Sequence, residues 1–309
     1  MKKRICFIFI IIFLICCPSV LAVSTDNLNI NSPACILVEE STGKILYEKN
    51  SKEKMFPAST TKVLTALLVL ENGNLSDNVV VSKEAVSSLS GGYITPYISI
   101  GEELSVEQLL NVLLVPSGNV AGNVLAEYIS GSISDFVILM NSRAEELGCV
   151  NSHFTNPYGL HDENHYSCAY DLYLMTKEAM KYDEFRSIVS KTSYTLAPSN
   201  KYSKNDRILY STNDLIKPNS TYFYEYAVGI KTGYTSQAKD CLISAANHGN
   251  MTLYCVVLGA DKSSSGTAYR YTDAKKLFDF GFNNYLFRTI RSKDSVVKTV
   301  EVSGATRKY

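Results

Sequence analysis

The chain has 309 residues, in which 30 basic residues balance 30 acidic ones, and it contains no tryptophan. This length suits one large domain, or one domain with an appendage. Because basic residues are not in excess, the composition argues against a nucleic-acid-binding surface, and we expect no nucleic-acid partner.

The N-terminus has the composition of a secretory signal peptide. Lys2, Lys3 and Arg4 precede an apolar run, and the segment 1–22 ends in the small residue Ala22. The run is short for a membrane span, which favours cleavage after residue 22 over retention as an anchor. Cleavage removes three basic and no acidic residues, so the net charge changes from 0 to −3. We expect a protein that acts outside the cytoplasm, either secreted or associated with the cell wall or membrane surface.

The cysteines predict neither a disulfide framework nor a structural zinc site. Their number after residue 22 is odd, their spacing is irregular, and they form no C-x-x-C pair. Those in apolar, strand-like runs are expected to be buried as small hydrophobic residues. The five are Cys35, Cys149, Cys168, Cys241 and Cys255, of which the first and the last two lie in such runs.

Apolar periodicity predicts strands at both ends of the chain and helices between them. The polar segment 39–44 joins the first two strands as a hairpin. Residues 155–161 and the polar stretch 198–225 are expected to be irregular. The expected strands are 34–38, 45–48, 79–81, 226–231, 241–246 and 253–258; the expected helices are 59–70, 105–114, 117–129, 134–147, 169–182 and 267–280.

Several helix ends carry recognisable signals. Ser105 and Gln108 match a capping box, and Pro116 ends the helix that they begin. Ser134 is expected to cap the start of a later helix, and Gly281 to end the last one.

The order of the elements predicts an α/β protein of the α+β type. An antiparallel sheet is flanked by helices, and the middle of the chain forms a mainly helical subdomain. We expect one domain over residues 23–285 and a short tail over 286–309, in which 296–302 is a plausible strand too short to build a core of its own.

Ser59 and Lys62 are the strongest candidates for catalysis. They begin an apolar helix, and a spacing of three residues places both side chains on one face. A lysine desolvated by apolar neighbours can lose its proton and then accept the proton of a serine hydroxyl. The positive end of the helix dipole favours negative charge beside the serine. The simpler alternative is that Ser59 only caps the helix.

The S-x-x-K spacing by itself is not specific. Ser51 and Lys54 share it, but they lie in a charged stretch where nothing would desolvate the lysine. Ser295 and Lys298 share it too, but residues three apart on a strand face opposite ways.

Two further short motifs follow in order along the chain. Ser117-Gly118-Asn119 lies at the Pro116 break between two apolar helices, where a hydroxyl and an amide can point into a cleft. Other S-x-N matches begin at residues 76, 203 and 211, and the last two are interpreted as ordinary loop residues. Lys231-Thr232-Gly233 ends a predicted strand, where it offers a positive charge, a hydroxyl donor and close backbone approach.

The ordered trio of motifs resembles the penicillin-interacting serine peptidases, specifically the low-molecular-mass D-alanyl-D-alanine carboxypeptidases. The resemblance covers about residues 30–285, the catalytic domain. Further agreement is found at 156–160, 165–172 and 257–260, and at Arg270, eleven residues before Gly281-Phe282.

The resemblance implies roles for individual residues in a β-lactamase-like fold that needs no metal or cofactor. Ser59 is the acylated nucleophile, Lys62 its base, and Ser117 a proton relay. The substrate is the D-Ala-D-Ala end of a peptidoglycan stem peptide, and β-lactams act as inhibitors. The residues that bind it are Asn119, Lys231, Thr232, Gly233, Arg270 and Tyr234, the last through its backbone N–H in an oxyanion hole shared with Ser59.

Two departures from the family are visible. Tyr234 stands where many relatives have histidine, which we expect to tune activity without removing it. Relatives usually continue into a β-rich domain and a membrane-surface helix, whereas only 24 residues follow Tyr285. The resemblance therefore leaves membrane association open, and a secreted or wall-associated enzyme is the simpler expectation.

Three alternatives remain. A class A β-lactamase would need a glutamate over the hydrolytic water, for which Glu163 is the candidate, and would turn over nitrocefin rapidly. A metallopeptidase would use His161 and His165, and EDTA would inactivate it. A non-catalytic wall-binding module would release no D-alanine.

Overall fold

The computed structural model describes residues 28–89, 98–203 and 206–286. The predicted signal peptide at 1–22 and the predicted strand at 296–302 lie outside these residues, as does the tail beyond Leu286. In the described part of the chain, no helix has both the length and the apolar character required to cross a bilayer.

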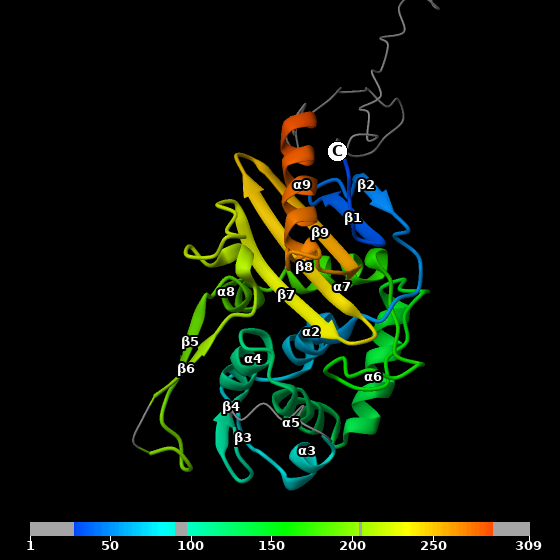
Figure 1. Cartoon of the computed structure of the whole chain (residues 1–309). Coiled ribbons are helices and arrows are strands. Elements are labelled where there is room, and N and C mark those ends of the chain that lie inside the picture. The colour runs from blue at the N-terminus through cyan, green and yellow to red at the C-terminus, as the bar shows by residue number, and fades with distance from the viewer. Residues whose placement is uncertain (1–27, 90–97, 204–205, 287–309) are drawn as a thin grey trace, which may run out of the picture. The chain divides into compact units, whose positions relative to one another are not determined.

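The main sheet joins the beginning and the end of the domain (Figure 1). It has five strands in the order β2-β1-β9-β8-β7, and every neighbouring pair is antiparallel. β1, β8 and β9 lie inside the sheet, which explains their nearly continuous apolar sequences. The strands are β1 (Ala34–Glu39), β2 (Ile45–Lys49), β7 (Ala227–Thr235), β8 (Lys239–His248) and β9 (Met251–Ala260).

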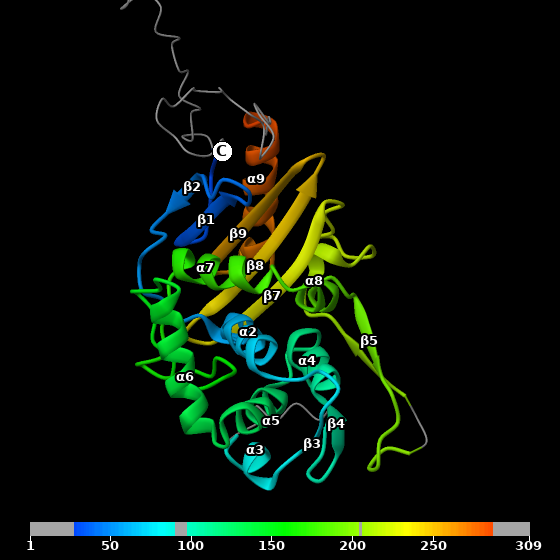
Figure 2. The ribbon, with the colours of Figure 1, turned by 180° about the vertical axis from the view of Figure 1, so that it is seen from behind.

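Helices cover both faces of this sheet. α9 (Tyr269–Asn284) lies along one face, over β8 and β9. The opposite face carries α7 (Ala169–Ala179), mainly over β1 and β9, and α8 (Asp183–Val189), beside β7 (Figures 1 and 2). α2 (Lys62–Asn72) packs against α7 and is buried from Lys62 to Val69, because α7 and the helices of the middle of the chain enclose it.

The middle of the chain forms the predicted, mainly helical part. Its helices pack around α2, and a two-stranded sheet of β3 and β4 lies beside them. These elements are α3 (Lys83–Ser87), α4 (Val106–Leu114), α5 (Asn119–Ser130), α6 (Ile133–Glu146), β3 (Asn78–Val80) and β4 (Glu103–Ser105). The predicted α+β class is confirmed.

The helix-end signals are right in two cases and wrong in two. α4 ends at Leu114, just before Pro116, as predicted. Ser105 and Gln108 form the predicted capping box. α6 is capped by Ser132 and not by Ser134, because the hydroxyl of Ser132 accepts from the N–H of Asp135.

Gly281 does not end the last helix, which continues to Asn284. A Cβ at Gly281 would lie 2.5 Å from Leu253 Cδ1 and 3.1 Å from Leu37 Cδ2. The glycine therefore serves close packing of α9 on the sheet, and a packing glycine cannot be distinguished from a helix stop by sequence alone.

The region 183–225 holds structure that the sequence did not predict. α8 follows α7 directly, and β5 (Ser193–Leu196) pairs with β6 (Arg207–Tyr210) as a hairpin. A short 3-10 turn, η2 (Asp214–Ile216), then leads back toward β7. The five cysteines of the described residues are buried and free, so the burial expected of Cys35, Cys241 and Cys255 is confirmed.

Candidate active site

Ser59 lies in the turn that leads into α2. The 3-10 turn η1 spans Ala58–Thr61, and Lys62 is the first residue of α2. Pro57 precedes the turn, and neither helix start has a side-chain cap, so the alternative that Ser59 is only an N-cap is wrong. Ala58 has φ of +49°, a conformation that is costly for a residue with a side chain. The surrounding structure therefore holds the serine in a strained turn.

Lys62 is fully buried and has three polar neighbours. Its Nζ lies 2.9 Å from the hydroxyl oxygen of Ser59. It donates to Asn119 Oδ1 at 2.8 Å and to the backbone oxygen of Tyr158 at 2.7 Å. The amide and carbonyl oxygens can only accept, so they take two N–H groups of the amine. In the neutral amine, the remaining lone pair then faces the Ser59 hydroxyl, which is the geometry a general base needs.

Burial and nearby charge favour the neutral form of this amine. Burial lowers the pKa of Lys62 well below its usual value, and the charge of Lys231 lowers it further. Burial also lowers the pKa of Lys231, to about 7, with a contribution from the charge of Arg270. The charge of Arg270 therefore opposes protonation of Lys231, and the charge of Lys231 opposes protonation of Lys62. Of the two lysines, Lys62 is the one with a serine hydroxyl beside it.

The second motif reaches the site through Asn119. Asn119 is the first residue of α5 and contacts Lys62 directly. Ser117 lies two residues earlier with φ of +67°, at the bend between α4 and α5. Within the described ranges its hydroxyl makes no hydrogen bond. Asn119 thus contacts the Ser59–Lys62 pair directly. Ser117 lies near this pair only because it is close to Asn119 in the chain.

The third motif lies on β7, an edge strand of the sheet. Lys231 is 1% exposed, and its amine donates to the backbone oxygen of Thr232 at 2.8 Å. Ile230 has φ of +99°, next to a register shift between Ala227 and Gly229. An edge strand has one side free of sheet partners, to which an extended peptide can add.

Two glycines allow backbone segments to approach the Ser59 turn closely. A Cβ at Gly233 would lie 3.0 Å from the backbone nitrogen of Ser59 and 3.0 Å from the oxygen of Pro57. A Cβ at Gly159 would lie 1.8 Å from the oxygen of Ala58, and Gly159 has φ of +87°. The role of glycine in K-T-G is therefore to bring β7 against the serine turn.

Arg270 and Tyr234 occupy the far end of this edge. Arg270 Nη1 lies 2.8 Å from Asp240 Oδ1 and 3.4 Å from the backbone oxygen of Gly233. Its guanidinium is thus held beside the K-T-G backbone by a buried carboxylate that sequence reasoning missed. The side chain of Tyr234 is 62% exposed, which leaves only its backbone within the packed edge.

Sequence reasoning also missed the loop that supports Lys62. Asn156 Oδ1 accepts from the backbone N–H groups of Tyr158, Gly159 and Leu160, at 3.3, 2.7 and 3.1 Å. This arrangement fixes the Tyr158 carbonyl, which accepts a hydrogen bond from the Lys62 amine. The sequence of 156–160 agrees with the family, but the position of a backbone carbonyl leaves no signal of its own in a sequence.

The two candidate metal-binding histidines have other partners. His165 Nδ1 accepts from the N–H of Thr155 at 3.1 Å, so Nε2 carries the proton and donates to Thr61 Oγ1 at 2.8 Å. Burial lowers the pKa of His165 to about 3. His161 lies 3.3 Å from Glu163, whose side chain is 84% exposed. Thus His165 supports the serine turn, and Glu163 is not enclosed in a site as the β-lactamase alternative requires.

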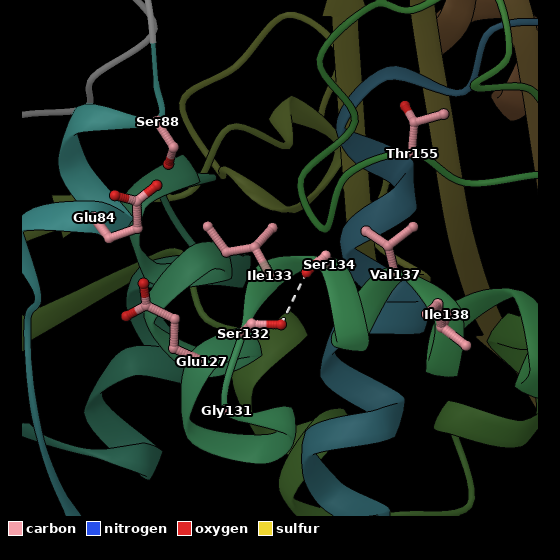
Figure 3. Close-up of a pocket in the computed structure, with 10 residues that line it drawn as sticks. All are labelled: Glu84, Ser88, Glu127, Gly131, Ser132, Ile133, Ser134, Val137, Ile138 and Thr155. Carbon is pink, nitrogen blue, oxygen red and sulfur yellow. Dashed lines mark hydrogen bonds between the residues drawn. The ribbon is translucent and has the colours of Figure 1, made fainter.

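A separate pocket of about 810 Å³ lies among α3, α5 and α6 (Figure 3). Glu84 and Glu127 extend into it beside the apolar Ile133, Val137 and Ile138. None of the predicted site residues lines it. The catalytic candidates are instead packed tightly together, so cavity size does not locate the chemistry in this chain.

Comparison with known proteins agrees with this geometry. The family model for D-alanyl-D-alanine carboxypeptidase matches residues 21–262. The carboxypeptidase DacF of Bacillus subtilis is 38% identical over 291 residues, which are 92% of this chain and 71% of that protein. DacC of Escherichia coli is 32% identical over 273 residues, 85% of this chain and 63% of that protein. The chain thus spans about two thirds of these curated relatives.

A solved structure gives the same result for the fold. The crystal structure of the Streptomyces K15 DD-transpeptidase matches with a TM-score of 0.73 and 30% identity, over 82% of this chain and 98% of that one. The resemblance drawn from the motifs is therefore confirmed. The chain belongs to the D-alanyl-D-alanine carboxypeptidase family of serine peptidases, the low-molecular-mass penicillin-binding proteins.

Proposed function

We propose that this chain removes the terminal D-alanine from peptidoglycan stem peptides through an acyl-Ser59 intermediate. The observation that carries the proposal is the buried amine of Lys62, 2.9 Å from the Ser59 hydroxyl, with its other contacts made to acceptors. Family membership supports the substrate class, and the geometry at Ser59 and Lys62 supports the proposed nucleophile and base.

In the acylation step, neutral Lys62 takes the proton of Ser59 as the serine oxygen attacks the carbonyl carbon of the penultimate D-alanine. The backbone N–H groups of Ser59 and Tyr234 stabilise the resulting oxyanion. Ser117 passes the proton from Lys62 to the leaving amine, the C–N bond breaks, and free D-alanine departs. The peptide remains as an ester on Ser59.

In deacylation, water attacks this ester, and Lys62 accepts a proton from the water and returns one to the serine oxygen. The products are the shortened peptide and the free enzyme, so the base is regenerated in each cycle.

The substrate lies along β7 as an added strand. Lys231, Thr232 and Arg270 hold its terminal carboxylate, and Asn119 holds a backbone amide. Gly233 lets β7, and with it the peptide added to this edge, lie close to the Ser59 turn. Charge supports this assignment, because Lys231 and Arg270 are both enclosed near the K-T-G edge and favour an anion there.

β-Lactams are expected to acylate the same serine, because their amide resembles the D-Ala-D-Ala amide.

We also propose that the enzyme acts outside the cytoplasm, where peptidoglycan is found, after removal of residues 1–22. N-terminal sequencing of the secreted protein should then begin at Val23, and an intact N-terminus would contradict cleavage.

The decisive test is D-alanine release from diacetyl-Lys-D-Ala-D-Ala, assayed without an acceptor amine and with or without penicillin. We expect release that penicillin abolishes, and a penicilloyl adduct that mass spectrometry places on Ser59. A label on another residue would refute the assignment. Rapid nitrocefin turnover would favour a β-lactamase, loss of activity in EDTA a metallopeptidase, and absence of release a wall-binding module.

A further inference from the structure

Thr212 connects three parts of the substrate-binding edge. It lies between β6 and η2, in the Ser211-Thr212-Asn213 segment that the sequence presents as an ordinary loop. Its backbone N–H donates to the oxygen of Val115 at 3.3 Å, two residues before Ser117. Its backbone oxygen accepts from the hydroxyl of Tyr271, adjacent to Arg270, at 3.1 Å.

The side chain of Thr212 makes the third connection, a hydrogen bond between its hydroxyl and that of Thr232. Thr232 is 5% exposed, so little water reaches its hydroxyl, and within the described residues the hydroxyl of Thr212 is its hydrogen-bond partner. Each hydroxyl has one proton, and only one of the two protons is used in the bond between them. If Thr212 is the donor, the proton of Thr232 is free to point to a ligand.

We propose that Thr212 is a positioning residue, which donates to Thr232 and so directs the Thr232 proton to the substrate's terminal carboxylate. This inference rests on the proposed function. An anion accepts a stronger hydrogen bond than a neutral hydroxyl does, so the bound carboxylate favours this direction of the pair. The residue does not touch the reacting atoms, and it acts through Thr232.

A structural role and an orienting role differ in what they do to two substrates. Loss of the Thr212 hydroxyl keeps both backbone bonds, to Val115 and Tyr271. An orienting role would therefore impair a substrate with a free carboxylate more than the same peptide as its C-terminal methyl ester. A merely structural role would impair both in equal proportion.

The experiment compares kcat/KM for diacetyl-Lys-D-Ala-D-Ala and its methyl ester, in the full chain and in Thr212→Val. We expect the acid-to-ester ratio to fall about tenfold in Thr212→Val. Thr212→Ser, which keeps the hydroxyl, should have the acid-to-ester ratio of the unmodified chain. Thr195→Val, an exposed threonine on β5, serves as the matched control and should leave the ratio unchanged.

A double-mutant cycle keeps the inference testable if Thr212→Val folds poorly. In a Thr232→Val background, Thr212→Ala should not lower the ratio further, because the group that it orients is absent. Equal loss on both substrates, an unchanged ratio, or additive effects would overturn the role of Thr212 while leaving the proposed function intact. If the unmodified chain releases no D-alanine, the proposed function and this inference fail together.

Discussion

Two segments eight residues apart share the spacing S-x-x-K, and only one of them has the environment of a catalytic pair. Ser51 is buried, and its hydroxyl donates to Glu48. Lys54 is exposed, with its amine 4.3 Å above the ring of Tyr166. Lys62 is instead fully enclosed, with Ser59 at 2.9 Å.

The difference shows that spacing alone does not make a lysine a base. The side chain of Lys54 is exposed to water. The amine of Lys62 has no water contact, so its charged form loses hydration energy that its neutral neighbours only partly replace. Desolvation, together with a serine in contact, therefore distinguishes the second segment.

The largest effect should come from removing each lysine in turn. Lys62→Ala removes the proposed base, and we expect acylation by penicillin to fall by about 10³- to 10⁴-fold with the fold retained. Lys54→Ala, the matched control, should acylate as the unmodified chain does. Stopped-flow acylation and circular dichroism measure the two quantities. An unimpaired rate in Lys62→Ala would show that another group accepts the serine proton.

The sequence could predict this pair because its features are local. An apolar run, a proline before it and a three-residue spacing all lie within residues 57–70, and the antiparallel sheet follows from strands at both chain ends. Even there, the serine lies in a 3-10 turn and α2 begins only at Lys62. Boundaries of this kind depend on packing against β7, which a local pattern does not contain.

Long-range partners could not be predicted in the same way. Asp240 beside Arg270, the Tyr158 carbonyl beside Lys62 and the hydroxyl of Thr212 beside Thr232 are contacts between distant parts of the chain. Asp240 lies in no motif, and the matches that contain Tyr158 and Thr212 do not show which distant residues these two contact. Their roles become visible only when the fold brings the segments together.

A second prediction concerns the close approach that encloses the Ser59 turn. Gly159→Ala would place a Cβ 1.8 Å from the oxygen of Ala58 at a positive φ, so the turn must shift. We expect the free energy of unfolding to fall by about 2–5 kcal/mol and acylation to fall with it.

Gly249→Ala is the matched control for this prediction. Gly249 also has a positive φ, of +61°, but a Cβ there meets nothing within 4 Å. Gly249→Ala should lower the free energy of unfolding by only about 1 kcal/mol and leave acylation unchanged. Urea unfolding and penicillin acylation measure both variants. Equal losses in the two would mean that backbone strain, and not the enclosure of Ser59, explains the requirement for glycine.

The smallest predicted effect tests whether the two buried lysines work in opposite protonation states. The pKa of Lys231 is lowered to about 7, so its charge is present below that pH and is lost above it. A carboxylate substrate needs this charge, and kcat/KM should therefore fall above about pH 7, by up to tenfold per unit. Lys62 must be neutral, so deprotonation of Lys62 should produce the rising limb at lower pH.

Lys231→Arg separates these two limbs, because arginine keeps its charge throughout this range. The falling limb should disappear in the variant, even at a lower absolute rate, while the rising limb stays in place. The methyl ester of the substrate, which offers no anion, should lack the falling limb in the unmodified chain as well. If the falling limb persists in Lys231→Arg, a group other than Lys231 causes it. If the rising limb moves with the substitution, the residue at position 231 controls the pKa of the base.

If only the rising limb remains, the two lysines have different roles although both are buried. Enclosure then makes Lys62 a base, while Lys231 remains the cation that binds the substrate.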